Sequence, residues 1–234
     1  MKVLLIPTAS LVLLVVFILL INFTNSANTR VLAQMAPELL VTWRANNYTP
    51  LNYAGKSLPT RETQVYASLE LIDALRPADI SKREIRWLLN NRLYKSGVGL
   101  KKIVFAVPEL TRDNQLLRAL VVNYRGQNVE QLVRIPVVDP EAVIGVPYPN
   151  RKIGAGENFF MAFGYFFNVN DLNDLSFLWS ANGASARGEN DLPNLLKLNA
   201  LGGRSGDKIN LSVSISNKIN PLELASDNVA LEIQ

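Results

Sequence analysis

Two amino acids are missing from this 234-residue sequence, which contains no histidine and no cysteine. Without histidine there can be no Ser-His-Asp triad, no Cys-His pair, no His-ligated zinc and no imidazole pH switch. Without cysteine there are no disulfides, but a chain that is long enough for two domains of about 100 residues does not need them to bury adequate cores. Its glycine-containing stretches do not form a complete phosphate-binding motif and are typical of turns.

Charge is absent from the 21 residues between Val3 and Phe23, and about 20 apolar residues are enough for a membrane-spanning helix. Lys2 precedes the run, so the positive-inside rule places the N-terminus in the cytoplasm and exports the rest. The phrase "VLAQ" also offers a signal-peptidase site after Ala33, which would give a secreted protein. The run is longer than a usual signal core and ends ten residues before Ala33. We therefore expect a single-pass signal anchor over 1–23 in the cell membrane.

Alternation of apolar and polar residues dominates the chain after a polar segment at 24–37, which is typical of a linker. Period-two alternation predicts strands with one buried face, and the β-branched and aromatic content agrees with this. Strands are predicted at Gln64–Ile72, Lys102–Val107, Leu116–Tyr124, Asn158–Phe167, Leu175–Trp179, Lys208–Asn217 and Asn228–Ile233. The sequence therefore predicts an all-β fold.

A tryptophan followed by an Asn-containing turn occurs in both halves, in "REIRWLLNN" and in "LSFLWSANG". Trp87 lies 34 residues before Val121, and Trp179 lies 34 residues before Val213, each within a later strand. The repeated order of strands predicts two units of one kind, with Trp87 and Trp179 as structural core residues on central strands.

The first of these phrases also fits a helix over 81–94, with Ser81 and Glu84 as a capping box. In a helix, Trp87 would lie off the apolar face. A hairpin that turns at Asn90-Asn91 instead places Trp87 in the core and matches the pattern of "LSFLWSANG". The hairpin is the preferred interpretation.

Prolines mark the division between the halves, with four of them between 136 and 149. We expect a first domain at 38–137, a Pro-rich connector at 138–150 and a second domain at 151–234. Both halves resemble bacterial immunoglobulin-like or PKD-like domains of surface proteins, in which "W…NG" hairpins precede the later strands. Neither the antibody disulfide nor the PKD phrase "FGDG" is present. The resemblance implies two tandem immunoglobulin-like β-sandwiches after the N-terminal helix.

Acidic residues offer two candidate sites. Asp171 and Asp174 lie in the oxygen-rich loop "NVNDLND" and are candidate calcium ligands. Two carboxylates are few for calcium, and Asn and Asp are the ordinary residues of turns, so the turn interpretation is preferred. Glu189 and Asp191 could pair with them as glycosidase carboxylates, although solvated acidic loops are far more common.

Basic residues gather around the predicted hairpin. Candidates for binding an anionic envelope polymer or lipid headgroup are Lys82, Arg83, Arg86, Lys101 and Lys102, although a solvated face is the preferred interpretation. Residues 34–137 contain 15 Lys/Arg against 9 Asp/Glu, and residues 138–234 contain 7 against 11. The aromatic strand Asn158–Phe167 carries more aromatic side chains than one core face requires, which predicts interdomain packing or a partner-binding patch.

These observations predict a non-catalytic envelope protein with a binding or structural role such as adhesion. We expect no cofactor, a membrane contact through the N-terminal helix, and a protein or cell-envelope polymer as partner. Nucleic acid is not expected, because the chain lacks a concentrated basic face with aromatic platforms. The alternatives are a carbohydrate-active hydrolase that uses the loop carboxylates, or an accessory subunit of a secretion or pilus assembly.

Overall fold

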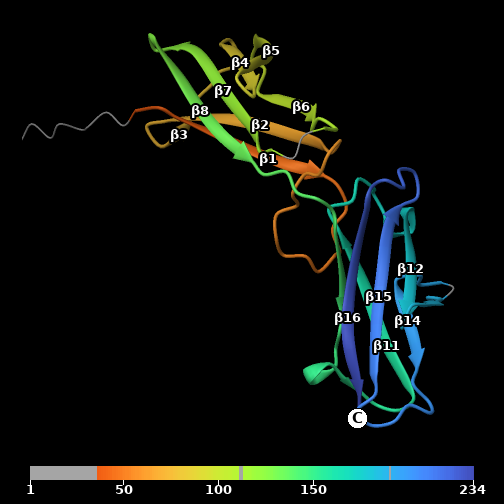
Figure 1. Cartoon of the computed structure of the whole chain (residues 1–234). Coiled ribbons are helices and arrows are strands. Elements are labelled where there is room, and N and C mark those ends of the chain that lie inside the picture. The colour runs from red at the N-terminus through yellow and green to blue at the C-terminus, as the bar shows by residue number, and fades with distance from the viewer. Residues whose placement is uncertain (1–35, 111–112, 190) are drawn as a thin grey trace, which may run out of the picture.

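Two β-sandwiches are joined end to end in the computed structural model, which describes residues 36–110, 113–189 and 191–234 (Figure 1). The N-terminal sandwich surrounds a hydrophobic core that runs from Leu39 to Ile135, and the C-terminal sandwich surrounds a second core from Ile144 to Ile233. Their long axes are bent relative to each other in Figure 1. Segment 1–23, predicted as a signal anchor, and Ala33 of the predicted cleavage site lie outside the described residues. Among the residues that are described, no helix is long and apolar enough to cross a membrane.

Two sheets form the N-terminal sandwich, and along their central strands β2 and β7 side chains alternate between the core and the surface. In the first sheet, β2 has β1 on one side and both β6 and the two-residue β3 on the other. The second sheet has the order β5-β4-β7-β8. The strands are β1 (Glu38–Asn46), β2 (Gln64–Asp73), β3 (Arg76–Pro77), β4 (Glu84–Leu89), β5 (Arg92–Val98), β6 (Lys102–Ala106), β7 (Gln115–Tyr124) and β8 (Gln127–Ile135).

The C-terminal sandwich is built in the same way. Its first sheet has the order β14-β11-β9, and its second has the order β10-β16-β15-β12-β13. The strands are β9 (Glu141–Gly145), β10 (Lys152–Ile153), β11 (Glu157–Tyr165), β12 (Leu175–Ala181), β13 (Ala184–Ala186), β14 (Leu195–Asn199), β15 (Lys208–Asn217) and β16 (Leu224–Ile233). Two short 3-10 helices, η1 (Pro149–Arg151) and η2 (Leu172–Asp174), lie in its connections.

The two sandwiches share one topology. When the two-residue strands β3 and β10 are set aside, the first, second and fifth strands of each unit form one sheet, and the remaining four form the other. Two antiparallel sheets with these crossing connections are the architecture of immunoglobulin-like domains. The predicted all-β fold of two tandem immunoglobulin-like sandwiches is confirmed in the described residues.

Each core contains one fully buried tryptophan on the third strand of its unit. The indole Nε1 of Trp87 donates a hydrogen bond to the carbonyl of Leu100 at 2.9 Å, and that of Trp179 donates to the carbonyl of Pro193 at 3.1 Å. In both units the ring therefore ties the core to the connection before the fifth strand. In the strand register Trp179 lies opposite Val213, and Trp87 lies opposite Ala119.

Both predicted hairpins are present, and segment 81–94 is not a helix. Asn90 and Asn91 have φ of 50° and 62°, and Asn182 and Gly183 have φ of 51° and 79°. Two consecutive positive φ angles define the tight turn that matches the twist of a two-stranded ribbon. Asn and Gly accept these angles at low cost, which explains their presence after each tryptophan.

The stretch 138–150, expected as a connector, contains β9. This edge strand pairs with β11, and its Ile144 is buried in the second core. Prolines 140 and 147 flank the strand without interrupting it, because the ladder hydrogen bonds lie between them.

Candidate functional site

Backbone hydrogen bonds join the two sandwiches where β1 and β11 end. The amide of Tyr48 donates to the carbonyl of Phe167 at 2.7 Å, and the amide of Phe166 donates to the carbonyl of Tyr48 at 2.8 Å. The side-chain amide of Asn47 donates to the carbonyl of Phe166 at 3.2 Å. The chain thus forms a short antiparallel bridge between its two units.

Aromatic rings cover this bridge. Tyr53, in the long connection after β1, contacts Tyr165 and Phe166 edge-on, with ring centroids 5.5 and 5.7 Å apart. The C-terminal end of the aromatic strand therefore packs against the N-terminal unit. The predicted interdomain packing is confirmed for this end of the strand.

Asn168 connects the units through both ends of its side chain. Its Oδ1 accepts a hydrogen bond from the hydroxyl of Thr63 at 2.5 Å, and its Nδ2 donates to the carbonyl of Arg61 at 2.7 Å. Thr63 is 1 % exposed and also bonds to Thr60 within its own unit. One side chain of the C-terminal unit thus bonds to two polar groups at the end of the N-terminal unit, one of them the buried hydroxyl of Thr63.

Glu223 holds Asn168 in place from the connection between β15 and β16. Its Oε1 accepts from the amide of Asn168 at 2.8 Å and from the hydroxyl of Thr60 at 3.5 Å. Its Oε2 accepts from Nδ2 of Asn217 at 2.7 Å. Both carboxylate oxygens are therefore engaged in fixing the junction.

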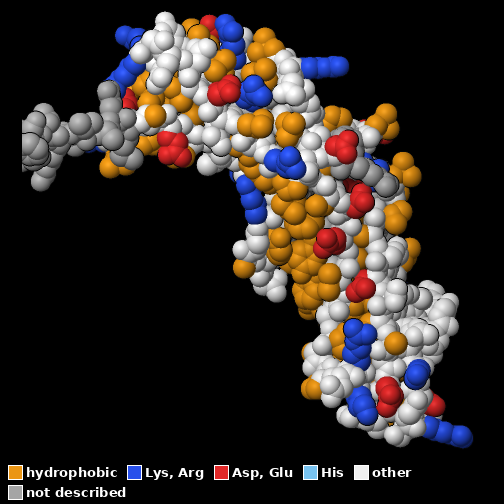
Figure 2. Space-filling view, turned by 60° about the vertical axis from the view of Figure 1, so that its left-hand side comes forward, with side chains coloured by type: hydrophobic (Ala, Val, Ile, Leu, Met, Phe, Trp, Pro, Cys, Tyr) orange, Lys and Arg blue, Asp and Glu red, His pale blue; other side chains and the backbone are white. Residues whose placement is uncertain are grey.

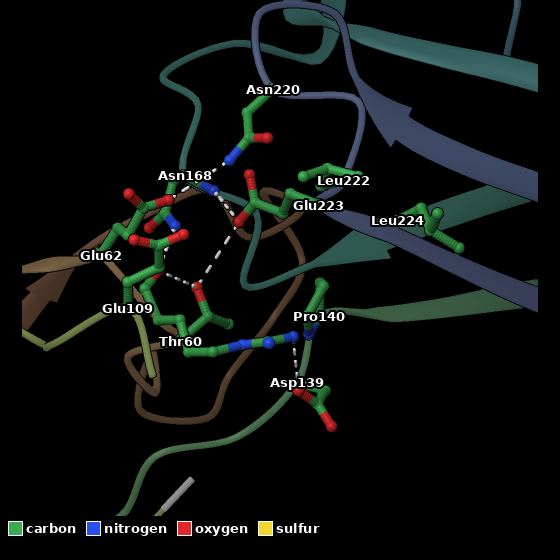
Figure 3. Close-up of a pocket in the computed structure, with 11 residues that line it drawn as sticks. Thr60, Glu62, Glu109, Asp139, Pro140, Asn168, Asn220, Leu222, Glu223 and Leu224 are labelled. Carbon is green, nitrogen blue, oxygen red and sulfur yellow. Dashed lines mark hydrogen bonds and ion pairs between the residues drawn. The ribbon is translucent and has the colours of Figure 1, made fainter. Parts of the chain in front are cut away.

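A cavity of about 560 Å³ lies between the units at this junction (Figure 3). Four carboxylates line it against one guanidinium: Glu62, Glu109, Asp139 and Glu223 against Arg61. Arg61 lies 3.4 Å from Asp139, and Nδ2 of Asn220 donates to Glu62 at 3.3 Å. These polar groups bond mainly to one another across the junction.

The arrangement around this cavity fits a connection between units better than a reaction centre. No group of three or more acidic side chains is placed to hold a metal ion anywhere in residues 36–110, 113–189 and 191–234.

The predicted calcium residues lie in the loop beside the junction. The Oδ1 of Asp171 accepts from the amide of Asn173 at 2.8 Å and caps η2, which is the ordinary use of Asp in a turn. The backbone of Asp174 accepts from the amide of Lys218. Burial, followed by the negative charge of Asp171, raises the pKa of Tyr48 above its ordinary value, so this loop also faces the bridge.

The second pair of candidate carboxylates lies in the connection between β13 and β14. The backbone of Glu189 bonds to that of Leu195 and of Leu192, which orders this connection. Asp171 and Asp174 lie in a different connection, between β11 and β12.

The predicted basic candidates make different contacts in the N-terminal unit. Arg83 donates to the carbonyl of Asn123, and Arg86 pairs with Glu84 at 2.7 Å, so both are used locally.

Two more of these candidates surround Asp79. Hydrogen bonds from Ser81 hold the pKa of Asp79 below its usual range, and the charges of Lys101 and Lys82 lower it further. Only Lys102 of the five predicted residues lines a groove, on the outer face of the first sheet.

Of the other charged residues of that groove, Lys95 belongs to the run of basic residues around the predicted hairpin, but nothing in the sequence singled out Arg44. Arg44 lies on β1, a strand that was not predicted because its apolar residues do not alternate cleanly. Strand register places Arg44 opposite Tyr66, and Ser68 opposite Lys102. The only sequence signal for this groove was the alternation of apolar and polar residues in β2, which correctly put Tyr66 and Ser68 on the outer face.

At the start of the aromatic strand, every second side chain faces outward. Phe159 and Met161 of β11 and Val143 of β9 are between 39 % and 45 % exposed. The ring of Phe163 lies over Gly145, where an added Cβ would come within 3.0 Å of it. Figure 2 shows hydrophobic side chains gathered on the C-terminal unit below its junction with the N-terminal unit.

Comparisons with solved structures give immunoglobulin-like and fibronectin-like domains at low similarity. The chain is similar to the fibronectin(III)-like modules of Clostridium thermocellum CbhA, with 14 % identity, a TM-score of 0.29, and coverage of 83 % of this chain and 94 % of that one. It is similar to three N-terminal domains of the bacteriophage RB49 Hoc protein, with 13 % identity, a TM-score of 0.33, and coverage of 85 % and 70 %. It is also similar to murine CEACAM1b, with 12 % identity, a TM-score of 0.30, and coverage of 83 % of this chain and 100 % of that one.

Likeness at this level says nothing about partner or activity. Neither a family model nor a curated protein matches the chain.

Proposed function

We propose that this chain is an exported, membrane-tethered envelope protein without catalytic activity, in which two immunoglobulin-like sandwiches are held in one orientation as a binding or structural module. The observation that carries this proposal is the junction, where Asn168 and Glu223 bond across the units. Domains joined by a simple linker move independently by default, because few contacts oppose that motion. A fixed orientation serves a protein that must present surfaces at a set angle and distance from its attachment point.

The apolar run at 3–23 supports the tether, and the linker at 24–37 would separate the membrane from β1. The described residues support a non-catalytic role through how their carboxylates are used. Glu223 is engaged by three donors at the junction, and Asp171 caps a turn. These groups stabilise the fold, which is the ordinary role of such residues in a presenting module.

The absence of cysteine makes both parts of this proposal directly testable, because any introduced cysteine is unique. For location, Gln131→Cys places a thiol on the exposed surface of β8. In intact bacterial cells a membrane-impermeant maleimide should label it, whereas a cysteine inserted between Met1 and Lys2 should be labelled only after lysis. Protection of the Gln131→Cys thiol until lysis would contradict export.

For orientation, spin labels at Gln131→Cys and Ser185→Cys report the distance between the two units. Both positions are exposed and lie away from the junction. Pulsed electron paramagnetic resonance on the full chain in detergent should give one narrow distance distribution. A broad distribution would mean that the units move independently, and the proposed presenting role would lose its basis.

A further inference from the structure

The outer face of the sheet formed by β1, β2 and β6 carries a groove of about 670 Å³, within the roughly 300–1,000 Å³ of small-ligand sites. Register builds it from two rungs that cross all three strands. Thr42, Ser68 and Lys102 form one rung, and Arg44, Tyr66 and Val104 form the next. Side chains in a rung lie directly opposite one another on the same face, so the two rungs are a contiguous surface.

A second element contributes to the wall of this groove. The hydroxyl of Tyr94 on β5 donates to the carbonyl of Val104 on β6 at 2.8 Å, and its ring packs edge-on against Phe105. This contact draws the edge of the second sheet against the edge of the first. It thereby brings Lys95, the next residue of β5, to the groove.

Three cations converge here without a negative partner. Across the described part of the chain, no carboxylate lies within 4.0 Å of the charged groups of Arg44, Lys95 or Lys102, although six other cations are paired. Glu70 shares the face but stands one rung beyond Ser68, opposite Leu40. Like charges that are gathered without counter-charges raise the local concentration of anions.

The groups in the groove are also positioned for hydrogen bonding. The guanidinium of Arg44 lies 4.6 Å from the centre of the Tyr66 ring, which orders it while leaving its N–H edges free for a carboxylate or phosphate. The hydroxyls of Thr42 and Ser68 are 2.9 Å apart, and whichever one donates to the other still has lone pairs for a ligand hydroxyl.

We infer that this groove binds a linear polysaccharide that bears carboxylate or phosphate groups. Its charges match the anionic groups, and its paired hydroxyls match sugar hydroxyls. A nucleic acid would need an open aromatic face, and that of Tyr66 is covered by Arg44. A concave site suits a polymer strand better than it suits a flat membrane. The inference rests on the proposed function in one respect only: export determines where the protein would meet such a polymer.

The test uses the full chain in a non-ionic detergent and fluorescence anisotropy with labelled polygalacturonate, labelled glycerol-phosphate teichoic acid and neutral labelled dextran. Comparing the two anionic polymers separates a carboxylate ligand from a phosphate ligand. The double variant Arg44→Gln, Lys102→Gln should bind the preferred polymer at least tenfold more weakly, since each charged hydrogen bond contributes about a factor of ten. Binding should also weaken as salt rises from low to physiological ionic strength.

The matched control is Arg204→Gln, Lys208→Gln, which removes one arginine and one lysine from exposed positions of the C-terminal unit. It should bind as the unaltered chain does. Equal binding by the two double variants, or no binding to either anionic polymer, would overturn the inference. Stronger binding to phosphatidylglycerol vesicles than to both polymers would overturn it in favour of a lipid surface. None of these results depends on cellular location or on the angle between units, so failure here is distinguishable from failure of the proposed function.

Discussion

Asn168 gives the sharpest test of the junction, because its side chain makes two hydrogen bonds that both cross between the units. Asn168→Ala removes both. A neutral hydrogen bond contributes roughly 0.5–1.5 kcal/mol net, so the two together amount to about 2 kcal/mol. The buried hydroxyl of Thr63 keeps its bond to Thr60, so the full cost of leaving a buried group unpaired does not apply.

Two measurements on the full chain in detergent check this value. Urea unfolding followed by tryptophan fluorescence should show the free energy of unfolding lowered by about 2 kcal/mol. The distance distribution between labels at Gln131→Cys and Ser185→Cys should broaden at the same time. A purely local loss of stability would leave that distribution unchanged.

The matched control is Asn170→Ala, two residues away in the same loop. Asn170 is exposed and its side chain makes no hydrogen bond within the described residues. Its substitution should change stability by less than about 0.5 kcal/mol. If Asn168→Ala behaves like Asn170→Ala in both measurements, the units are not held by these bonds, and the junction argument is refuted.

Three further predictions concern the sandwiches themselves. Trp179→Phe leaves the partly buried carbonyl of Pro193 without this donor and should lower the free energy of unfolding by about 1–3 kcal/mol, measured by urea unfolding; an unchanged value would remove the indole hydrogen bond as a source of stability. Gly183→Ala, at φ of 79°, should cost about 1 kcal/mol, whereas Gly154→Ala, which has open space around it, should be nearly neutral; equal melting temperatures would contradict the tight-turn assignment. The hydrogen bond that Tyr124 donates to Asp73 raises the pKa of Tyr124 above its ordinary 10, so the stability from this bond is present below pH 10 and is lost as pH rises through the higher folded value. In Tyr124→Phe the melting temperature should therefore decrease less steeply above pH 10 than in the unaltered chain. An equally steep decrease in both would show that other groups cause it.

Local chemistry made the hairpins and the repeated topology predictable. Asn90-Asn91 and Asn182-Gly183 specify their turns through backbone angles that few residue pairs accept, so the sequence contains that information within a few positions. The alternation of β2 and β15 likewise identifies the buried face without knowledge of the partner strand. β1 escaped prediction because Leu39, Leu40 and Val41 are apolar in succession.

The sites were not predictable, because they depend on register and on contacts between distant segments. Thr63 and Asn168 are 105 residues apart, and neither residue type indicates a junction by itself. Lys102 was selected as part of a basic cluster read along the sequence. Its neighbours in the groove, Arg44 and Ser68, become neighbours only through the pairing of three strands.

The pairing of β10 with β16 has a mechanical consequence. The two-residue β10 runs parallel to the end of β16, and the amide of Gln234 donates to the carbonyl of Ile153 at 2.9 Å. A pull on the C-terminus against the N-terminal unit draws β16 lengthwise past β10, so their hydrogen bonds bear the load together rather than opening one after another. The C-terminal sandwich is thus arranged to resist tension along the chain.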